Sequence, residues 1–325
     1  MKHNYILFSV FVLVFLISCN TMDYIKDDHI RLDYAISSFF SPDSLFIIKI
    51  DSVQKFFFKS GEEMNARIDA VVLTSLSSNE HFALQKIDDS SFLYTSPLVC
   101  LKKGGEYKIE VFLDSTDEVI SAIDSIPNSE PSFNLLSTGV RIDRNAMGDA
   151  SLVNATCVIL LVPPKNMLRS YYELKVFTKS YARELNYFAV NEVQVGLESS
   201  SILITSEDYY PTGTSIDKSK PSSLLFSTSG DVDSVLIDFV YCPDISLPDV
   251  LSEHDLRIEL SCVSYAYYKY KTSLYKQKNA LRGDVIFGAA QPVSVYSNVN
   301  YGTGIFAGYT VLSKKVHVDK FVYYD

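Results

Sequence analysis

The spacing of hydrophobic positions is the main structural signal in this chain. In Leu256-Arg-Ile-Glu-Leu-Ser-Cys262 every second side chain is apolar, so one face of a β-strand would pack while the other meets water. Similar short segments recur at close intervals, separated by Gly, Ser, Asn and Asp, and they predict a mainly β fold of sandwich type. They lie at residues 45–50, 66–74, 81–87, 107–113, 119–123, 140–144, 155–162, 171–178, 235–241, 311–318 and 321–324.

Turn and linker signals divide these strands into two groups. Lys102-Lys-Gly-Gly105 predicts a turn, because glycine adopts positive φ without a Cβ clash. Ile126-Pro-Asn-Ser-Glu-Pro131 is typical of a linker. We therefore predict two β-sandwich-like domains, an immunoglobulin-like one at residues 41–131 and a C-terminal β-rich one at residues 132–325.

One segment has a helical period instead, from about Tyr265 to Asn279. Apolar side chains fall there at i, i+3 and i+7, and three lysines point the other way. The inward positions are Tyr267, Tyr270 and Leu274, and the outward ones are Lys269, Lys276 and Lys278.

The amino terminus predicts export and a lipid anchor. The apolar segment Tyr5–Ile17 is shorter than the ~20 residues that span a bilayer as a helix, and it is typical of a signal peptide at residues 1–18. Leu16-Ile17-Ser18-Cys19 matches the lipobox of bacterial lipoproteins, in which a diacylglycerol is transferred to the cysteine sulfur before cleavage. We predict lipidation of Cys19, followed by a flexible tether at residues 19–40.

The amino-acid composition limits the classes of partner that we expect. The 325 residues carry a formal net charge of −10, and removal of residues 1–18 takes away a further positive charge, so a nucleic-acid partner is disfavoured. The chain has no Trp, which weakens a sugar-binding hypothesis because sugar platforms commonly use that ring. The cysteines after Cys19 are widely spaced beside apolar residues, and buried free thiols are favoured over one incidental disulfide. These cysteines are Cys100, Cys157, Cys242 and Cys262.

No motif predicts catalysis, a metal or a cofactor. The five histidines form no H-x-x-x-H or H-E-x-x-H pattern, and no G-x-S-x-G motif is present. The adjacent acids Glu62-Glu63 and Asp88-Asp89 would point to opposite faces of a strand. Gly302-Thr-Gly304 lacks the third glycine of a phosphate loop, so backbone geometry explains it better. We predict a protein that is not an enzyme, with an unrecognised hydrolase as the remaining catalytic alternative.

Several stretches together resemble the Bacteroidota lipoproteins grouped as domain of unknown function 4249. The strongest match is the Tyr-rich helix followed by Pro292, Ser297-Asn298, Gly302-x-Gly304 and Phe306. Weaker matches are Gly105-x-Tyr107 and the pair Tyr171-Tyr172, whereas Ser170 and Ser227 depart from the family pattern. The resemblance covers most of the mature chain. It implies an envelope lipoprotein encoded beside TonB-dependent transporters, with no established enzymatic activity.

This resemblance leads to a functional hypothesis. We expect a noncatalytic outer-membrane lipoprotein that binds or assists a TonB-dependent transporter, with a structural or adhesive cell-surface lipoprotein as the alternative. Asp23 and Lys26-Asp27-Asp28 resemble the surface-export signal of Bacteroidota lipoproteins, which favours the cell surface over the periplasmic face. No motif names the ligand.

Two sets of residues are candidate sites. The tyrosines of the helix are too many to bury on one stripe, so the helix and the loop after it predict a partner-binding face. Its candidate residues are Tyr268, Tyr296, Asn298 and Tyr301. Asp-Ser-aliphatic or Asp-Ser-Thr triplets resemble O-glycosylation sites of exported Bacteroidota proteins. These place candidate modifications at Ser44, Ser52, Ser115, Ser125 and Ser234.

Overall fold

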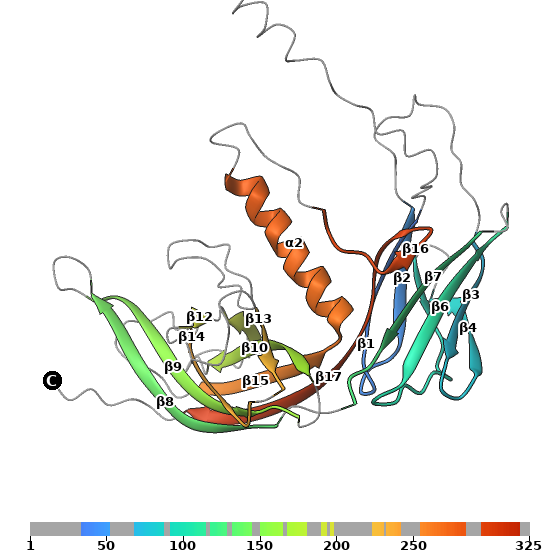
Figure 1. The fold of residues 1–325 in the computed structure, drawn as a ribbon. Helices are drawn as coiled ribbons and strands as arrows, with labels where there is room; N and C mark the ends of the chain where they lie inside the picture. Colours follow the sequence, from blue (N-terminus) through green and yellow to red (C-terminus); the bar gives the residue numbers. More distant parts are fainter. Residues whose placement is uncertain are drawn as a thin grey trace, which may run out of the picture. The chain divides into compact units, whose positions relative to one another are not determined.

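The fold is mainly β, as the hydrophobic period predicts, and is described from a computed structural model (Figure 1). Leu32–Asp325 form one compact unit. The structure describes residues 34–52, 68–87, 92–114, 118–128, 132–144, 150–164, 168–180, 190–193, 196–197, 223–230, 232–241, 254–283 and 294–318. The strands within these ranges are β1 (Tyr34–Phe40), β2 (Ile47–Ser52), β3 (Ile68–Ser75), β4 (Glu80–Lys86), β5 (Leu93–Thr95), β6 (Glu106–Leu113), β7 (Val119–Ser125), β8 (Ser132–Arg144), β9 (Ala150–Val162), β10 (Arg169–Ser180), β11 (Val190–Val193), β12 (Gly196–Leu197), β13 (Ser223–Ser229), β14 (Val235–Tyr241), β15 (His254–Val263), β16 (Val299–Asn300) and β17 (Thr303–Val318), and the helix α2 spans Tyr265–Gly283.

The strands form two sheets. The larger one follows the order β11-β10-β15-β17-β1-β2-β5-β4-β3-β6-β7-β16, with β13 also paired to β10. The smaller one has the order β12-β14-β9-β8. Apart from the parallel pair β1 and β17, the paired strands are antiparallel.

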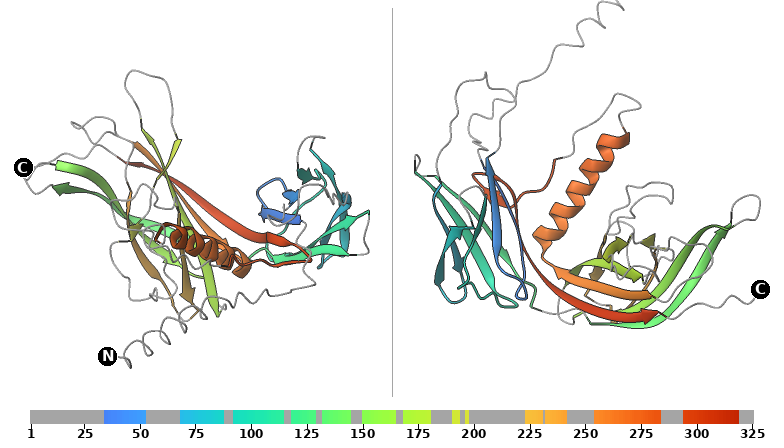
Figure 2. Two further views of the ribbon diagram at one scale, coloured as in Figure 1. Left: turned by 90° about the horizontal axis from the view of Figure 1, so that it is seen from above. Right: turned by 180° about the vertical axis from the view of Figure 1, so that it is seen from behind.

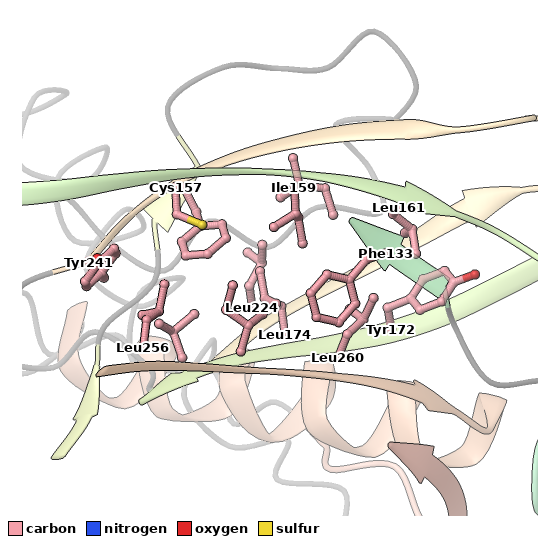
Figure 3. Close-up of a cluster of buried hydrophobic side chains, with 14 of the residues drawn as sticks. Phe133, Cys157, Ile159, Leu161, Tyr172, Leu174, Leu224, Tyr241, Leu256 and Leu260 are labelled. Atoms are coloured by element: carbon pink, nitrogen blue, oxygen red, sulfur yellow. The ribbon is translucent and has the colours of Figure 1, made fainter. Parts of the chain in front are cut away.

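Alternating side chains build two main hydrophobic cores. One lies among β1–β7 and includes Ile36, Phe40 and Tyr107. The other lies between the smaller sheet and the strands β10, β13, β15 and β17. Figure 3 shows this second core, with Cys157, Ile159 and Leu161 of β9 facing Leu174 and Leu260.

The last strand, β17, belongs to both cores, and it can be followed through the views of Figure 2. Its residues Thr303–Gly308 pair with β1, and Tyr309–Val318 pair with β15. Phe306 fills the first core, whereas Leu312 and Val318 on the same strand face contact the second. The predicted division into two domains is therefore not confirmed, because the C-terminal strand completes the N-terminal core.

Two segments predicted to be irregular contain core residues. The predicted tether, residues 19–40, is too long, since Tyr34–Phe40 form β1 with Ile36 and Phe40 fully buried. The predicted linker begins with Ile126, which is only 1% exposed. Its N–H donates to the carbonyl of Gly105 and its carbonyl accepts from Gly104. In these two short segments, tertiary contacts decide the conformation, and the local sequence pattern does not.

The predicted turn at Lys102–Gly105 is confirmed. Gly104 has φ +71°, and the N–H of Gly105 donates to the carbonyl of Lys102. The hydroxyl of Tyr107 accepts a hydrogen bond of 2.7 Å from the N–H of Lys102. A Cβ on Gly105 would lie 2.7 Å from this hydroxyl, so the Gly105-x-Tyr107 pair serves this tight corner.

Candidate docking faces

The helix α2 begins where β7, β15 and β17 meet. The N–H of Tyr267 donates to Oγ of Ser264 at 3.1 Å, which makes Ser264 the N-cap. Ser264 also donates its own N–H to the carbonyl of Gly308 in β17. A carboxylate oxygen of Asp124, near the end of β7, accepts the N–H of Gly308 at 2.9 Å. These bonds join the start of the helix to strands from both cores.

Close backbone packing explains why a glycine stands at this junction. A Cβ on Gly308 would lie 2.5 Å from the carbonyl oxygen of Ser125. Burial raises the pKa of Asp124, and the hydrogen bonds from Ser264, Gly308 and Ser125 partly offset this effect. Asp124 therefore acts as a structural acceptor at the junction.

The helix face that packs on the sheet corrects the sequence hypothesis. Tyr267 and Tyr268 are both at most 6% exposed and belong to a third hydrophobic cluster with Ile305 and Ala307 of β17. Tyr267 contacts the ring of Phe39 edge-on at 4.8 Å. The expected exposure of Tyr268 is wrong, because this ring packs against Tyr171 of β10 at 4.9 Å.

A buried carboxylate fixes the same helix face. Glu173 of β10 is 1% exposed and accepts hydrogen bonds from the hydroxyls of Ser223 at 2.7 Å and Tyr267 at 2.5 Å. Lys175 forms an ion pair with it at 3.3 Å. Burial alone would raise the pKa of Glu173, but the charges of Lys175 and Lys271 and the two hydroxyl donors outweigh burial and lower it. Burial and the neighbouring Glu173 carboxylate raise the pKa of Tyr267 well above its ordinary value.

The opposite side of the helix is exposed, as predicted for its lysines. Lys269 and Lys276 are exposed, and Tyr265 is 51% exposed. The ammonium group of Lys269 lies 5.3 Å from the ring centre of Tyr265. Tyr265 also packs against Tyr171 at 5.5 Å. The expectation that some of the tyrosines lie at the surface is thus confirmed by Tyr265.

The loop after the helix divides into structural and exposed residues. Asn298 accepts from the N–H of Phe306 at 3.0 Å and donates to its carbonyl at 2.7 Å, so it substitutes for a paired strand. Tyr296 is half-buried, and burial raises its pKa. Tyr301 is 64% exposed and has φ +57°. The loop therefore offers Tyr301, and part of Tyr296, to a partner, whereas Asn298 is engaged with the backbone.

The glycines of this stretch have a conformational role. Gly304 has φ +110°, and a Cβ there would lie 1.9 Å from the carbonyl oxygen of Ile36. Together with Asn298 and buried Phe306, this glycine seats β17 beside β1. The explanation of Gly302-Thr-Gly304 by backbone geometry agrees with the structure.

The structure shows an exposed apolar sheet face that the sequence hypothesis missed. On the outer side of the smaller sheet, Leu236 is 45% exposed, Val162 is 37% exposed and Leu136 is 54% exposed. Leu236 pairs with half-buried Leu160, so these side chains adjoin across β14 and β9. Leu136 is the extra residue of a bulge in β8. We call Leu136, Val158, Leu160, Val162 and Leu236 the apolar sheet face.

A signal for this face is present in the sequence. Residues 157–162 are an unbroken apolar run, a pattern typical of strands buried on both faces. The alternate residues Cys157, Ile159 and Leu161 fill the core, which leaves Val158, Leu160 and Val162 on the outer face. By contrast, no sequence signal marks Glu173, which stands at a polar position of an ordinary alternation between Tyr172 and Leu174. Asp124 breaks the alternation of β7, because it lies on the inward side of the strand with Ile120 and Ala122 while Ile123 is exposed.

The candidate modification sites are only partly described. Ser44, Ser52 and Ser125 are exposed, and Ser234 is half-buried. Ser115 and the lipidation candidate Cys19 lie outside the described residues. Of the described serines, Ser125 ends β7, and its backbone carbonyl lies close to Gly308 of β17.

The cysteines of the described ranges are free thiols. Cys157 and Cys262 are buried and Cys100 is exposed. Burial raises the pKa of Cys157 to about 12, which keeps it protonated near neutral pH. The preference for buried free thiols therefore holds for Cys157 and Cys262, and Cys242 lies outside the described residues.

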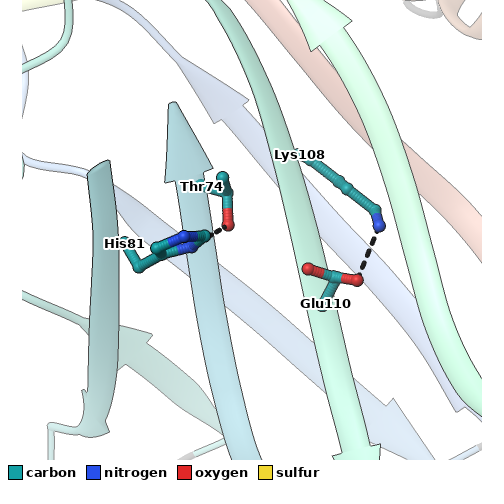
Figure 4. A network of polar contacts seen from close by, with 4 residues as sticks. All are labelled: Thr74, His81, Lys108 and Glu110. Atoms are coloured by element: carbon teal, nitrogen blue, oxygen red, sulfur yellow. Dashed lines mark hydrogen bonds and ion pairs between the residues drawn. The ribbon is translucent and has the colours of Figure 1, made fainter. Parts of the chain in front are cut away.

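Polar side chains elsewhere form local contacts, between the neighbouring strands β3 and β4 and along the strand β6. Figure 4 shows Thr74 bonded to Nδ1 of His81 at 2.9 Å and Lys108 paired with Glu110 at 2.6 Å. Within the described ranges, no three His, Cys, Asp or Glu side chains are grouped so that they could hold a metal ion. In the same part of the chain, no helix has the length and apolarity to cross a membrane. The pairs Glu62-Glu63 and Asp88-Asp89 lie outside it.

Comparisons with known proteins place this fold in a family. No curated protein matches the chain. Among solved structures, the collagen-binding domain of the Erysipelothrix rhusiopathiae surface protein RspB is 10% identical, with 86% of this chain and 96% of that chain covered at a TM-score of 0.16, too low to carry an argument. A family described as Domain of unknown function (DUF4249) matches residues 35–315, from β1 to β17. The chain therefore belongs to the DUF4249 family.

Proposed function

We propose that this protein is a noncatalytic lipoprotein of the outer membrane, displayed at the cell surface, that binds a TonB-dependent transporter through the apolar sheet face. Lipidation of Cys19 would hold it at the membrane, and the transporter would cover Leu160, Val162 and Leu236. The lipobox and the family resemblance support the setting.

The exposed apolar sheet face is the observation that carries this proposal. An antiparallel sheet with one solvated side usually alternates apolar and polar residues, but β9 has aliphatic residues on both sides. Contiguous exposed aliphatic side chains on a rigid sheet are typical of protein–protein interfaces. A partner that removes Leu136, Val162 and Leu236 from water would gain roughly 25 cal/mol per Å² of apolar surface.

Co-purification from detergent-solubilised outer membrane tests the partner. We expect the wild-type protein to retain a transporter in stoichiometric amount and Val162→Ser with Leu236→Ser to lose it. The matched control is Leu45→Ser with Leu98→Ser. These two exposed aliphatic residues belong to the part of the chain that forms the first core, among β1–β7. Both pairs should unfold near the wild-type temperature, since exposed substitutions usually cost under ~0.5 kcal/mol each. Absence of a transporter together with intact cell adhesion would instead support a structural or adhesive lipoprotein.

The lipid anchor has a separate test. Cys19→Ala removes the only thiol at the predicted cleavage boundary. We expect this variant to incorporate no labelled palmitate and to fractionate away from the outer membrane. Retention of both label and membrane fractionation by Cys19→Ala would refute the lipobox assignment.

A further inference from the structure

The helix α2 is basic although the chain as a whole is acidic. The helix contains four lysines, one arginine and no acidic residue, whereas the whole chain has a formal net charge of −10. A basic helix on an acidic protein creates a local positive field directed away from the rest of the surface. The basic residues are Lys269, Lys271, Lys276, Lys278 and Arg282.

Part of this charge forms a solvent-facing stripe. With about 100° of rotation per residue, Tyr265, Lys269 and Lys276 lie within roughly 40° of one another around the helix. All three are exposed, and the opposite side of the helix packs on β17 through Tyr267. The contact of Lys269 with the ring of Tyr265 holds an ammonium group beside an exposed aromatic ring.

The stripe lies within reach of the predicted anchor. Tyr267 on α2 contacts Phe39, five residues along β1 from Tyr34, which corresponds to about 17 Å of strand. The 14 residues between Cys19 and Tyr34 span at most about 50 Å when fully extended. An anchored molecule can therefore turn α2 toward the membrane that holds its lipid.

We propose that Tyr265, Lys269 and Lys276 of α2 bind anionic lipid headgroups at the membrane surface. The proposal rests on the lipid anchor of the proposed function but not on the transporter. Lysine stems and tyrosine rings suit the headgroup region, where an apolar body and a polar end are both accommodated. Because the rest of the acidic chain is repelled by an anionic surface, this stripe also sets the orientation in which the protein meets the membrane.

Vesicle sedimentation tests the stripe without the anchor. The probe is the chain from residue 19 onward carrying Cys19→Ala, with vesicles of phosphatidylcholine alone or with phosphatidylglycerol added. We expect binding only to the anionic vesicles, with loss of binding as salt is raised. Lys269→Gln with Lys276→Gln should weaken binding about 30-fold, because each lysine near an anionic membrane surface strengthens binding about fivefold. Lys102→Gln with Lys103→Gln, at an exposed turn, is the control with the same change of charge and should bind as wild type.

Several outcomes would overturn the proposal. These are equal binding to neutral and anionic vesicles, an equal loss in the control pair, and unchanged binding of the α2 pair. Salt-sensitive binding to soluble polyglutamate without binding to vesicles would assign the stripe to an acidic protein instead. Since the probe carries no lipid, failure here is distinct from failure of palmitate labelling at Cys19.

Discussion

Two carboxylates hold α2 in place, and their surroundings shift their pKa values in opposite directions. Asp124 accepts the backbone N–H of Gly308 in a partly buried position, and burial raises its pKa. Glu173 is more deeply buried, but two lysines and two hydroxyl donors outweigh the effect of burial and lower its pKa. At the residue scale, the surroundings of Asp124 favour its protonated form, whereas those of Glu173 favour its charged form.

A double-mutant cycle on Glu173 and Tyr267 tests the stabilised charge. Glu173→Gln should lower the free energy of unfolding by roughly 1.5–3 kcal/mol at neutral pH, since hydrogen bonds to a charged group are lost. Tyr267→Phe removes the same hydroxyl contact, so the two losses should not add. Because the folded pKa lies below the ordinary 4.5, this stability is present above pH 4.5 and is lost as the pH falls through the folded pKa. Denaturant titrations at several pH values measure both effects, and simple additivity would contradict the contact.

Asp124 gives the opposite pH dependence. Asp124→Ala should cost about 1–3 kcal/mol because the N–H of Gly308 loses its acceptor, whereas Asp124→Asn keeps an acceptor oxygen. With a folded pKa raised above 3.8, the stability contributed by protonating Asp124 is full below 3.8 and is lost as the pH rises through the folded pKa. The Asp124→Asn variant should therefore compare best with wild type near neutral pH and lose that advantage on acidification. Denaturant titrations of the two proteins at several pH values measure this, and a stability difference that does not change with pH would contradict the burial of this carboxyl.

At the scale of elements, the decisive feature is how β17 docks beside β1. Gly304 at φ +110° lets the strand approach the carbonyl of Ile36, and Asn298 satisfies both backbone groups of Phe306. The stretch that carries the family resemblance thus maintains strand docking. This explains Asn298, Gly304 and Phe306 of that stretch without any ligand, whereas Pro292 lies outside the described residues.

Replacing Gly304 tests this docking. Gly304→Ala should destabilise the fold by more than about 3 kcal/mol for two reasons. The added Cβ would clash with the backbone of Ile36, and the alanine would have to adopt a positive φ that L side chains rarely adopt. The neighbouring Thr303→Ala is the control and should have a small effect, since its side chain is half-exposed. Thermal unfolding of the two variants measures the difference, and near-equal midpoints would contradict the described backbone approach.

At the scale of the whole molecule, the shared strand predicts one cooperative unfolding transition. Phe306→Ala in the first core and Ile258→Ala in the second are each expected to cost several kcal/mol, at roughly 2–5 kcal/mol for a buried large side chain. Both should lower the midpoint of the same transition, because loss of β17 opens both cores. Calorimetry that resolves two transitions, each sensitive to one variant, would support two independent domains instead.

The strand and helix periods of the sequence predict much of the local structure. The segments predicted at residues 107–113 and 256–262 correspond to β6 and β15, and the predicted helix begins at Tyr265 as expected. These predictions succeed because alternation and helical spacing depend on near neighbours in the chain. The prediction of docking residues was less accurate, because Tyr268 is buried and Asn298 is hydrogen-bonded to the backbone of Phe306.

The sequence by itself determined the mainly β class, the tight turn at Gly104 and the exposed lysines of α2. Only the tertiary structure decided that β17 serves both cores, that Glu173 lies beneath the helix and that the outer side of β9 meets solvent. The physical reason is the distance along the chain between the interacting residues. Turn and period signals arise within a few residues, whereas the contact of Tyr267 with Glu173 joins residues 94 positions apart. Which of five tyrosines on one helix is buried depends on the distant strands that pack against it.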